Sequence, residues 1–148
     1  MAKALIAYYS RTGKTKKMAE YIAEGVRMTG SSADVKPLSD LKKADQLAGY
    51  DGYALGSPTY HRDMTEGMKQ FLFLMEKAEP KGKVGCAFGS YTHSGDAPKI
   101  IFDTLEHVFK MEMLQLGSFN LKEAVVDTDE GLRACQDYGK SLGEKIRP

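Results

Sequence analysis

Short runs of almost continuously apolar residues alternate along this chain with longer segments whose apolar residues recur at helical spacing. Strands that are covered by helices on both faces have this apolar character, and their alternation with helices predicts an α/β fold with a parallel sheet and right-handed crossovers. We expect five strands, at 4–8, 33–36, 52–57, 83–89 and 113–119, the last interrupted before 124–126. We expect helices at 14–28, at 63–77, from 96 or 98 to 110, and from Asp127 onward, with one helical turn in 41–49.

The size and charge of the chain restrict its class. At 148 residues it is long enough to bury a core without disulfides, and we expect one domain, 1–148. The net charge of +1 gives no overall field that would require nucleic acid or an anionic membrane as partner. No apolar segment reaches membrane-spanning length and no signal-peptide pattern occurs, so we expect a cytoplasmic protein. Cys86 and Cys135 lack the spacing of a metal or redox motif and are expected to be core thiols.

Two groups of side chains invite a functional interpretation but have a simpler one. Basic residues gather near the start of the chain, and we favour a solvated helix face over a partner-docking patch. This basic group comprises Arg11, Lys14, Lys16 and Lys17. Methionines recur at helical spacing at 64, 68 and 75, and we expect them to fill the core.

Three short polar loops follow three of the predicted strands. They are Ser10–Thr15, Gly56–His61 and Gly89–Asp96. In an open parallel sheet, ligands bind beyond the carboxyl ends of the strands, where the strand order reverses. All three loops lie at carboxyl ends, so we expect them to surround one ligand.

The first loop has the chemistry of a phosphate site. It ends a strand and opens a helix, where backbone N–H groups and the positive end of the helix dipole attract anions. The hydroxyls of Ser10, Thr12 and Thr15 add donors, and Gly13 allows a close backbone approach. A nucleoside-triphosphate loop is excluded because its first glycine would fall on Tyr8. Helix capping alone is the remaining alternative.

The other two loops carry side chains with flat rings. Proline stiffens the backbone of the second loop, and glycine makes that of the third flexible. Tyr60 follows Pro58 in the second loop, and Tyr91 and His93 precede Gly95 in the third. Each ring taken alone is more simply a surface residue, and His61 without a partner is more simply an ordinary histidine than a catalytic one. A phosphate site flanked by two such loops nevertheless fits a flat ring system with one phosphate, and FMN fits better than a triphosphate.

These motifs resemble those of a known family. The pattern Ser10-x-Thr12-Gly13-x-Thr15 resembles the phosphate loop of flavodoxins. Gly56-Ser57-Pro58-Thr59-Tyr60 and Gly89-Ser90-Tyr91 resemble the loops that flank the isoalloxazine ring in short-chain flavodoxins and in the flavodoxin module of flavodiiron proteins. The resemblance implies a flavodoxin-like three-layer sandwich, a sheet of order 2-1-3-4-5, and tightly but non-covalently bound FMN.

The resemblance also assigns roles to individual residues. It implies that Ser10, Arg11, Thr12, Gly13, Lys14 and Thr15 hold the phosphate. It implies that Ser57, Pro58, Thr59, Tyr60, His61 and Arg62 line one side of the ring, and that Ser90, Tyr91, Thr92, His93 and Gly95 line the other. No residue is assigned to catalysis or to metal binding.

The chain departs from the family pattern in three respects. His61 stands where many flavodoxins have a glycine whose peptide turns to accept a hydrogen bond from reduced flavin N5, which predicts weaker semiquinone stabilisation. His93 stands where the family often has tryptophan or tyrosine, so stacking on that side is expected to be weaker, and a protonated imidazole there would favour the anionic reduced flavin. Flavodoxins are typically strongly acidic, whereas this chain is nearly neutral, which leaves its partner surface open.

The leading functional prediction is a low-potential electron carrier that shuttles electrons between redox partner proteins as a monomer or weak homodimer. The alternative is a flavin-dependent NAD(P)H:quinone or FMN reductase on the same fold, in which His61 and Arg62 face the second substrate. A third possibility is a signalling module without flavin, although a phosphoacceptor receiver would have aspartate where this chain has Ser57.

Overall fold

A parallel sheet forms the middle layer of the computed structural model, which describes residues 1–148. Its order is β2-β1-β3-β4-β5, with β6 also paired to β4, and every pairing is parallel. The strands are β1 (Lys3–Tyr8), β2 (Ser32–Pro37), β3 (Gly52–Gly56), β4 (Val84–Tyr91), β5 (Glu112–Met113) and β6 (Phe119–Lys122). The flavodoxin-like order expected from the sequence is therefore confirmed.

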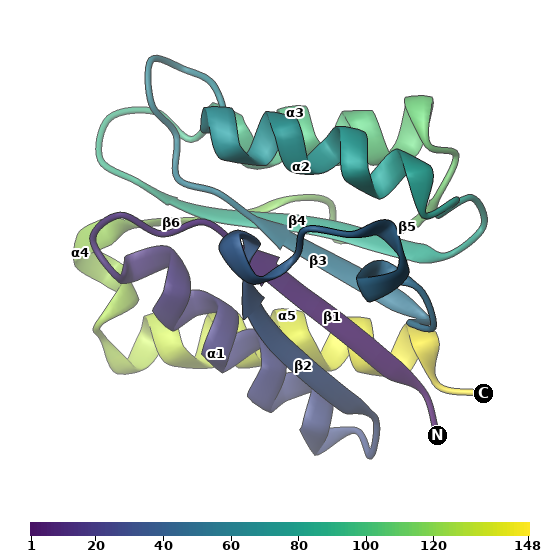
Figure 1. Ribbon diagram of the computed structural model, residues 1–148. Helices are drawn as coiled ribbons and strands as arrows, with labels where there is room; N and C mark the ends of the chain where they lie inside the picture. Colours follow the sequence, from purple (N-terminus) through teal and green to yellow (C-terminus); the bar gives the residue numbers. More distant parts are fainter.

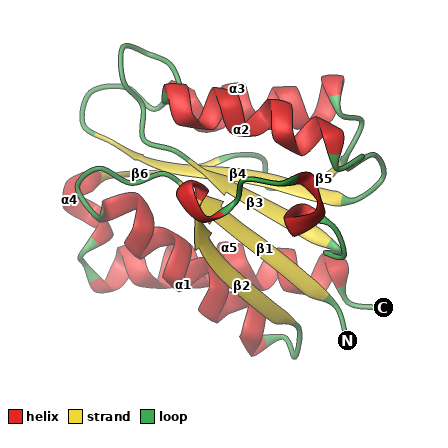
Figure 2. Ribbon diagram, viewed as in Figure 1, coloured by secondary structure: helices red, strands yellow, loops and turns green.

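Helices cover both faces of the sheet (Figures 1 and 2). The long helices are α1 (Lys14–Met28) and α5 (Asp129–Ile146) on one face, and α2 (Glu66–Lys77) and α3 (Asp96–Asp103) on the other. A π-helical turn, Thr104–Val108, continues α3, and α4 (Glu123–Val126) is a single turn. Two 3-10 turns, Leu38–Asp40 and Ala44–Leu47, connect β2 to β3.

Successive residues of β1 belong to two separate cores. Ile6 packs with Met18, Ile22 and other residues on the face covered by α1 and α5. Its neighbour Leu5 packs into the core on the face covered by α2 and α3. Alternation of side chains along a strand produces this division, and both residues are completely buried, as expected for a central strand. The methionine stripe is core, because Met68 and Met75 are fully buried against the α2 side of the sheet.

Glycines allow α1 and α5 to approach each other closely. A Cβ on Gly139 would lie 1.9 Å from the carbonyl oxygen of Ile22, and a Cβ on Gly25 would lie 2.0 Å from that of Gln136. Any larger residue would force α1 and α5 apart. This contact fixes α1, whose amino end forms part of the site described below.

The last strand differs most from the sequence prediction. Expected as 113–119 with continuation near 124–126, it is two short pieces that pair with opposite halves of β4. The residues between the pieces include Gly117 at a φ of 81°, which breaks the strand. Ala124 to Val126 are helical in α4 rather than extended.

Two helix starts also differ from the sequence prediction, and a π-helical turn alters a third helix. The Thr65 side chain accepts a hydrogen bond from the Met68 N–H, so α2 begins at Glu66 instead of residue 63. Thr128 accepts from the Gly131 N–H at 3.0 Å, which moves the start of α5 from Asp127 to Asp129. The π-helical turn changes the helical phase, and Val108 within it is 61% exposed.

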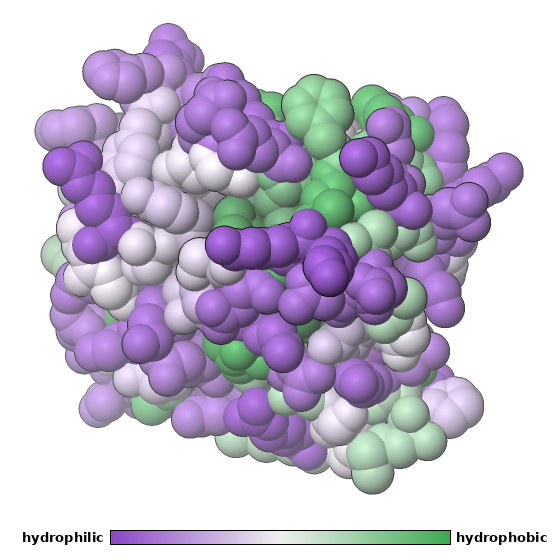
Figure 3. All heavy atoms as spheres, viewed as in Figure 1, coloured by the Kyte–Doolittle hydropathy of each residue, from purple (hydrophilic) through white to green (hydrophobic).

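Cys86 and Cys135 are buried and free, as expected. Burial raises the pKa of each thiol to about 12. Every helix of the structure is too short or too polar to cross a lipid bilayer. Figure 3 shows a mostly hydrophilic face on which apolar side chains gather beside α2, where Leu38, Leu41, Phe71 and Leu74 line a hollow.

Candidate functional site

The first loop joins β1 to α1 and leaves the amino end of that helix without a side-chain cap. Gly13 is the N-cap residue, with a φ of 91° that favours glycine, and its N–H donates to Ser10 Oγ at 3.0 Å. No side chain accepts a hydrogen bond from the first turn of α1, and that turn contains no acidic residue. Its backbone N–H groups therefore remain available to an anion, reinforced by the helix dipole.

The second loop contains a tight hairpin turn at His61 and Arg62. Tyr60 and Asp63 exchange two backbone hydrogen bonds, of 2.9 and 3.0 Å, across this turn. His61 has a φ of 52° and Arg62 a φ of 63°, the positive values that a type I′ turn requires at both central positions. Glycine and asparagine are preferred there. His61 and Arg62 therefore each adopt an unfavourable backbone conformation, which costs about 1–2 kcal/mol of conformational free energy per residue.

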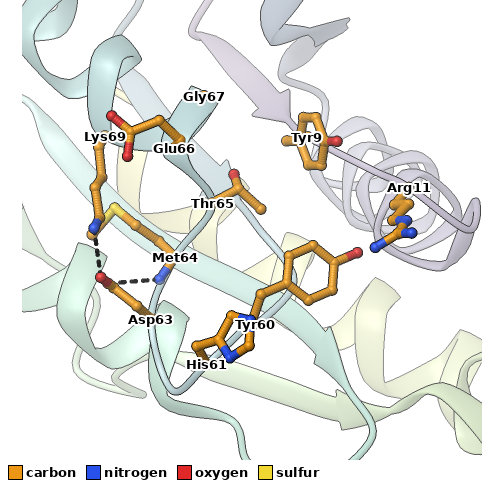
Figure 4. A pocket seen from close by; sticks show the side chains of 10 residues that line it. All are labelled: Tyr9, Arg11, Tyr60, His61, Asp63, Met64, Thr65, Glu66, Gly67 and Lys69. Carbon is orange, nitrogen blue, oxygen red and sulfur yellow. Dashed lines mark hydrogen bonds and ion pairs between the residues drawn. The ribbon is translucent and has the colours of Figure 1, made fainter.

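Asp63 anchors this turn to α2. Its carboxylate accepts a hydrogen bond from the Met64 N–H at 2.7 Å and pairs with Lys69 Nζ at 2.6 Å (Figure 4). The Lys69 hydrogen bond lowers the pKa of Asp63, and the same contact raises the pKa of Lys69. These contacts hold the hairpin in place and help to offset its backbone strain.

Two hydroxyl contacts connect the third loop to the others. The Thr15 and Ser90 hydroxyl oxygens lie 2.9 Å apart, which joins α1 to the end of β4. Thr59 Oγ1 accepts a hydrogen bond from the Ala97 N–H at 2.9 Å, which joins the second loop to the start of α3. The three loops therefore form one connected edge of the sheet.

Gly95 is held close to β6. The Asn120 side-chain amide donates to the Gly95 carbonyl at 2.7 Å, and a Cβ on Gly95 would lie 2.7 Å from the same amide nitrogen. A larger residue at that position would displace the Asn120 side chain.

Two adjacent hollows open beside the Tyr60–His61 segment. The first, which we call the three-loop hollow, measures about 580 Å³ and is lined by residues from all three loops: Arg11, Thr59, Tyr60, His61, Arg62, Thr92, His93 and Ser94. The second, which we call the α2 hollow, measures about 550 Å³ and lies between Tyr9, Tyr60 and the start of α2 (Figure 4). The Arg11 guanidinium lies 5.8 Å from the centre of the Tyr60 ring.

The structure brings together seven of the residues predicted from the sequence around the three-loop hollow. They are Arg11, Thr59, Tyr60, His61, Arg62, Thr92 and His93. Four others, Thr15, Ser57, Pro58 and Ser90, are buried beneath the loops and do not line the hollow. Ser90 and Tyr91 belong to β4 itself, which is longer than predicted.

Two predicted phosphate-loop side chains contact the far end of the chain instead. Thr12 Oγ1 donates to Glu123 Oε1 at 3.1 Å, and Lys14 pairs with Asp127, which also pairs with Lys17. The hydrogen bonds from Lys14 and Lys17 lower the pKa of Asp127 to about 2. Glu123 and Asp127 were not predicted as site residues, because nothing in the sequence places α4 beside the first loop.

Comparison with known proteins agrees with this geometry. A family model described as flavodoxin matches residues 6–135. A flavodoxin of Aquifex aeolicus is 32% identical, over 99% of this chain and 88% of its own length, and one of Maridesulfovibrio salexigens is 32% identical over 99% and 100%. The solved structure of an archaeal flavodoxin superposes with a TM-score of 0.87 at 32% identity, covering 97% of this chain and 98% of that one.

Proposed function

This chain belongs to the flavodoxin family, and from that premise we propose which of its residues hold the FMN on which it carries electrons between redox partner proteins. Residues 10–15 bind the phosphate, and residues 57–62 together with 90–93 and Gly95 flank the ring. The observation that carries this assignment is the three-loop hollow, to which all three loops contribute. Residues 1–148 act as a single FMN-binding unit.

The amino end of α1 fits a phosphate group. Its first-turn N–H groups have no side-chain acceptor, and Gly13 holds the backbone in the conformation that exposes them. Ser10 and Thr12 carry hydroxyls beside these donors, while Thr15 is bonded to Ser90 and has a mainly supporting role. A helix amino end with free N–H donors and no acidic residue in its own first turn stabilises a dianion.

The three-loop hollow fits a flat ring. Tyr60 supplies an aromatic ring from the second loop, and Thr92 and His93 line the same hollow from the third. The hydrogen bonds of Thr59 and Asp63 hold the second loop in one conformation, which lowers the entropy that ligand binding must overcome. When bound there, FMN supplies the electron-transfer chemistry, and the protein supplies its orientation and electrostatic surroundings.

Anaerobic reduction of the FMN-loaded protein tests this proposal. We expect the purified chain to take up one FMN per molecule and the bound flavin to pass electrons to a one-electron acceptor. A protein that remains colourless after incubation with FMN would overturn the proposal. NAD(P)H separates the carrier from the reductase alternative: we expect no oxidation of NADH or NADPH above the rate of free FMN, and steady turnover would favour the reductase.

A further inference from the structure

Two arginines and two histidines line the three-loop hollow. Arg11, His61, Arg62 and His93 lie around it, and no aspartate or glutamate lines it. All four residues are exposed, and the Arg62 side chain is 83% exposed. We call these four residues the basic rim.

This excess of basic groups is local. The chain as a whole has a net charge of only +1. The adjoining α2 hollow mixes Lys69 with Asp63 and Glu66, so both signs of charge occur there. At the basic rim, Asp96 lies 3.4 Å from Arg62 Nε and leaves most of the guanidinium exposed. The neighbouring Asp63 carboxylate is paired with Lys69.

The fold also separates Arg11 from Lys14 and Lys17, although these basic residues are close together in the sequence. Lys14 and Lys17 turn to Asp127, and this ion pairing partly cancels their charge. Arg11 instead turns to the Tyr60 ring and joins Arg62 at the hollow, although the two are far apart in the chain. Arg11 and Arg62 therefore place positive charge where we propose the ring edge lies.

We propose that the basic rim docks redox partner proteins through an acidic surface around the partner's own redox centre. This inference rests on the proposed function, because it assumes that electrons leave through the three-loop hollow. Opposite charges around two redox centres raise the encounter rate and orient the proteins, and only charges within about 10 Å of the contact act strongly at physiological salt. A nucleic acid is disfavoured, since such partners are bound by many phosphate contacts along an extended basic surface, and this rim is confined to one hollow.

Electron transfer to two haem proteins of opposite charge tests the partner class. The soluble domain of cytochrome b5 is acidic and mitochondrial cytochrome c is basic, and each fully reduced FMN would reduce two ferric haems to ferrous haems. We expect the second-order rate with cytochrome b5 to fall about tenfold as salt is raised from low to physiological levels. A rate that rises with salt for cytochrome b5 and falls for cytochrome c would overturn the proposal.

Charge reversal localises the effect. We expect Arg62→Glu and Arg11→Glu each to slow cytochrome b5 reduction severalfold at low salt. The matched control is Lys81→Glu, an equal charge change at an exposed residue without an ion pair before β4, at the opposite edge of the sheet, and we expect it to change the rate less than twofold. Equal effects of all three variants would mean that only net charge matters and would overturn the assignment to the rim.

Two further measurements keep this inference separate from the proposed function. FMN content is measured for every protein, so a wild-type chain without FMN would defeat the proposed function itself. Amide NMR shifts of the unmodified protein, titrated with cytochrome b5, locate the contact without any substitution. We expect the largest changes at residues 61–62 and 92–93, and changes confined to other surfaces would overturn the inference while leaving FMN binding intact.

Discussion

The hydroxyl oxygens of Thr15 and Ser90 lie 2.9 Å apart, and each residue is only 1% exposed. Thr15 is the second residue of α1, and Ser90 lies near the end of β4. Their contact joins the proposed phosphate loop to the strand that leads into the proposed ring loop. Both ends of the site are therefore fixed by one buried pair of polar groups.

Removing both partners of this pair should destabilise the protein by less than the two single removals added together. Ser90→Ala leaves the Thr15 hydroxyl buried without a partner, which costs about 1–3 kcal/mol of unfolding free energy. Thr15→Val combined with Ser90→Ala should lose less than the sum of the two single variants. Urea unfolding of the four proteins measures the coupling. Strictly additive losses would show that the two hydroxyls do not stabilise each other.

Gly13 should be needed for FMN binding beyond its contribution to stability. Gly13→Ala places a Cβ on a residue with a φ of 91°, and Gly30→Ala does the same at 92°, with open space around both. Each change should reduce stability by about 1 kcal/mol. Only Gly13→Ala should weaken FMN binding, about tenfold, as measured by fluorescence titration, because only Gly13 positions the N–H groups of α1. Equal losses of affinity in both variants would contradict this.

Local patterns in the sequence were sufficient where a segment's environment is uniform. α1 has the predicted bounds, because its apolar stripe, including Met18 and Ile22, faces one continuous core. β3 was predicted to within one residue for the same reason. The phosphate-loop and ring-loop motifs likewise indicated the carboxyl edge, since parallel strands bring their ends together whatever the helices between them do.

Contacts between segments that are far apart in the chain could not be predicted from local sequence patterns. The two carboxylates beside the first loop, Glu123 and Asp127, are more than 100 residues from Thr12 and Lys14. The turn at His61 and Arg62 carries neither glycine nor asparagine, so the usual signal for a type I′ turn was absent. The tertiary anchor from Asp63 to Lys69 holds that turn, and no local propensity reports such an anchor.

Asp127 should stabilise the protein in a pH-dependent way. Lys14 and Lys17 lower its folded-state pKa to about 2, below its value of about 3.9 in an unfolded chain, so its stabilising contribution is present above pH 4 and is lost as pH falls toward 2. Asp127→Asn should therefore be less stable than the wild type at pH 7, with the difference shrinking by pH 3. Urea unfolding at both pH values measures this, with Asp45→Asn, exposed and unpaired, as the control. A difference that does not depend on pH would exclude the ion pairs as its cause.

Glu123 should weaken FMN binding in the wild-type protein. Its carboxylate accepts the Thr12 hydroxyl at 3.1 Å and places a negative charge beside the proposed phosphate position. Glu123→Gln removes that charge while keeping an acceptor, and we expect FMN to bind severalfold more tightly at low salt and less so at high salt. Glu130→Gln, an exposed change in the first turn of α5, provides the comparison. Unchanged affinity in Glu123→Gln would mean that the phosphate lies away from this carboxylate.

His61 should limit the rotation of the peptide that joins it to Arg62. Turning that peptide over converts a type I′ turn into a type II′ turn, in which the first central residue is glycine because a Cβ is poorly tolerated there. In the wild-type protein this rotation, and with it a hydrogen-bond acceptor for reduced flavin N5, is disfavoured.

Replacing His61 with glycine should release this restriction. We expect His61→Gly to raise the maximum amount of one-electron-reduced FMN seen in an anaerobic dithionite titration, by about fivefold in the underlying equilibrium if the backbone penalty is about 1 kcal/mol. Glu79→Gly is the matched control, because Glu79 has a φ of 53° against 52° for His61 and lies between α2 and β4, away from the three loops. It should relieve the same kind of strain and raise stability without altering the titration. A wild-type protein that already forms the one-electron state almost quantitatively would show that the His61 backbone turns freely and would refute this explanation.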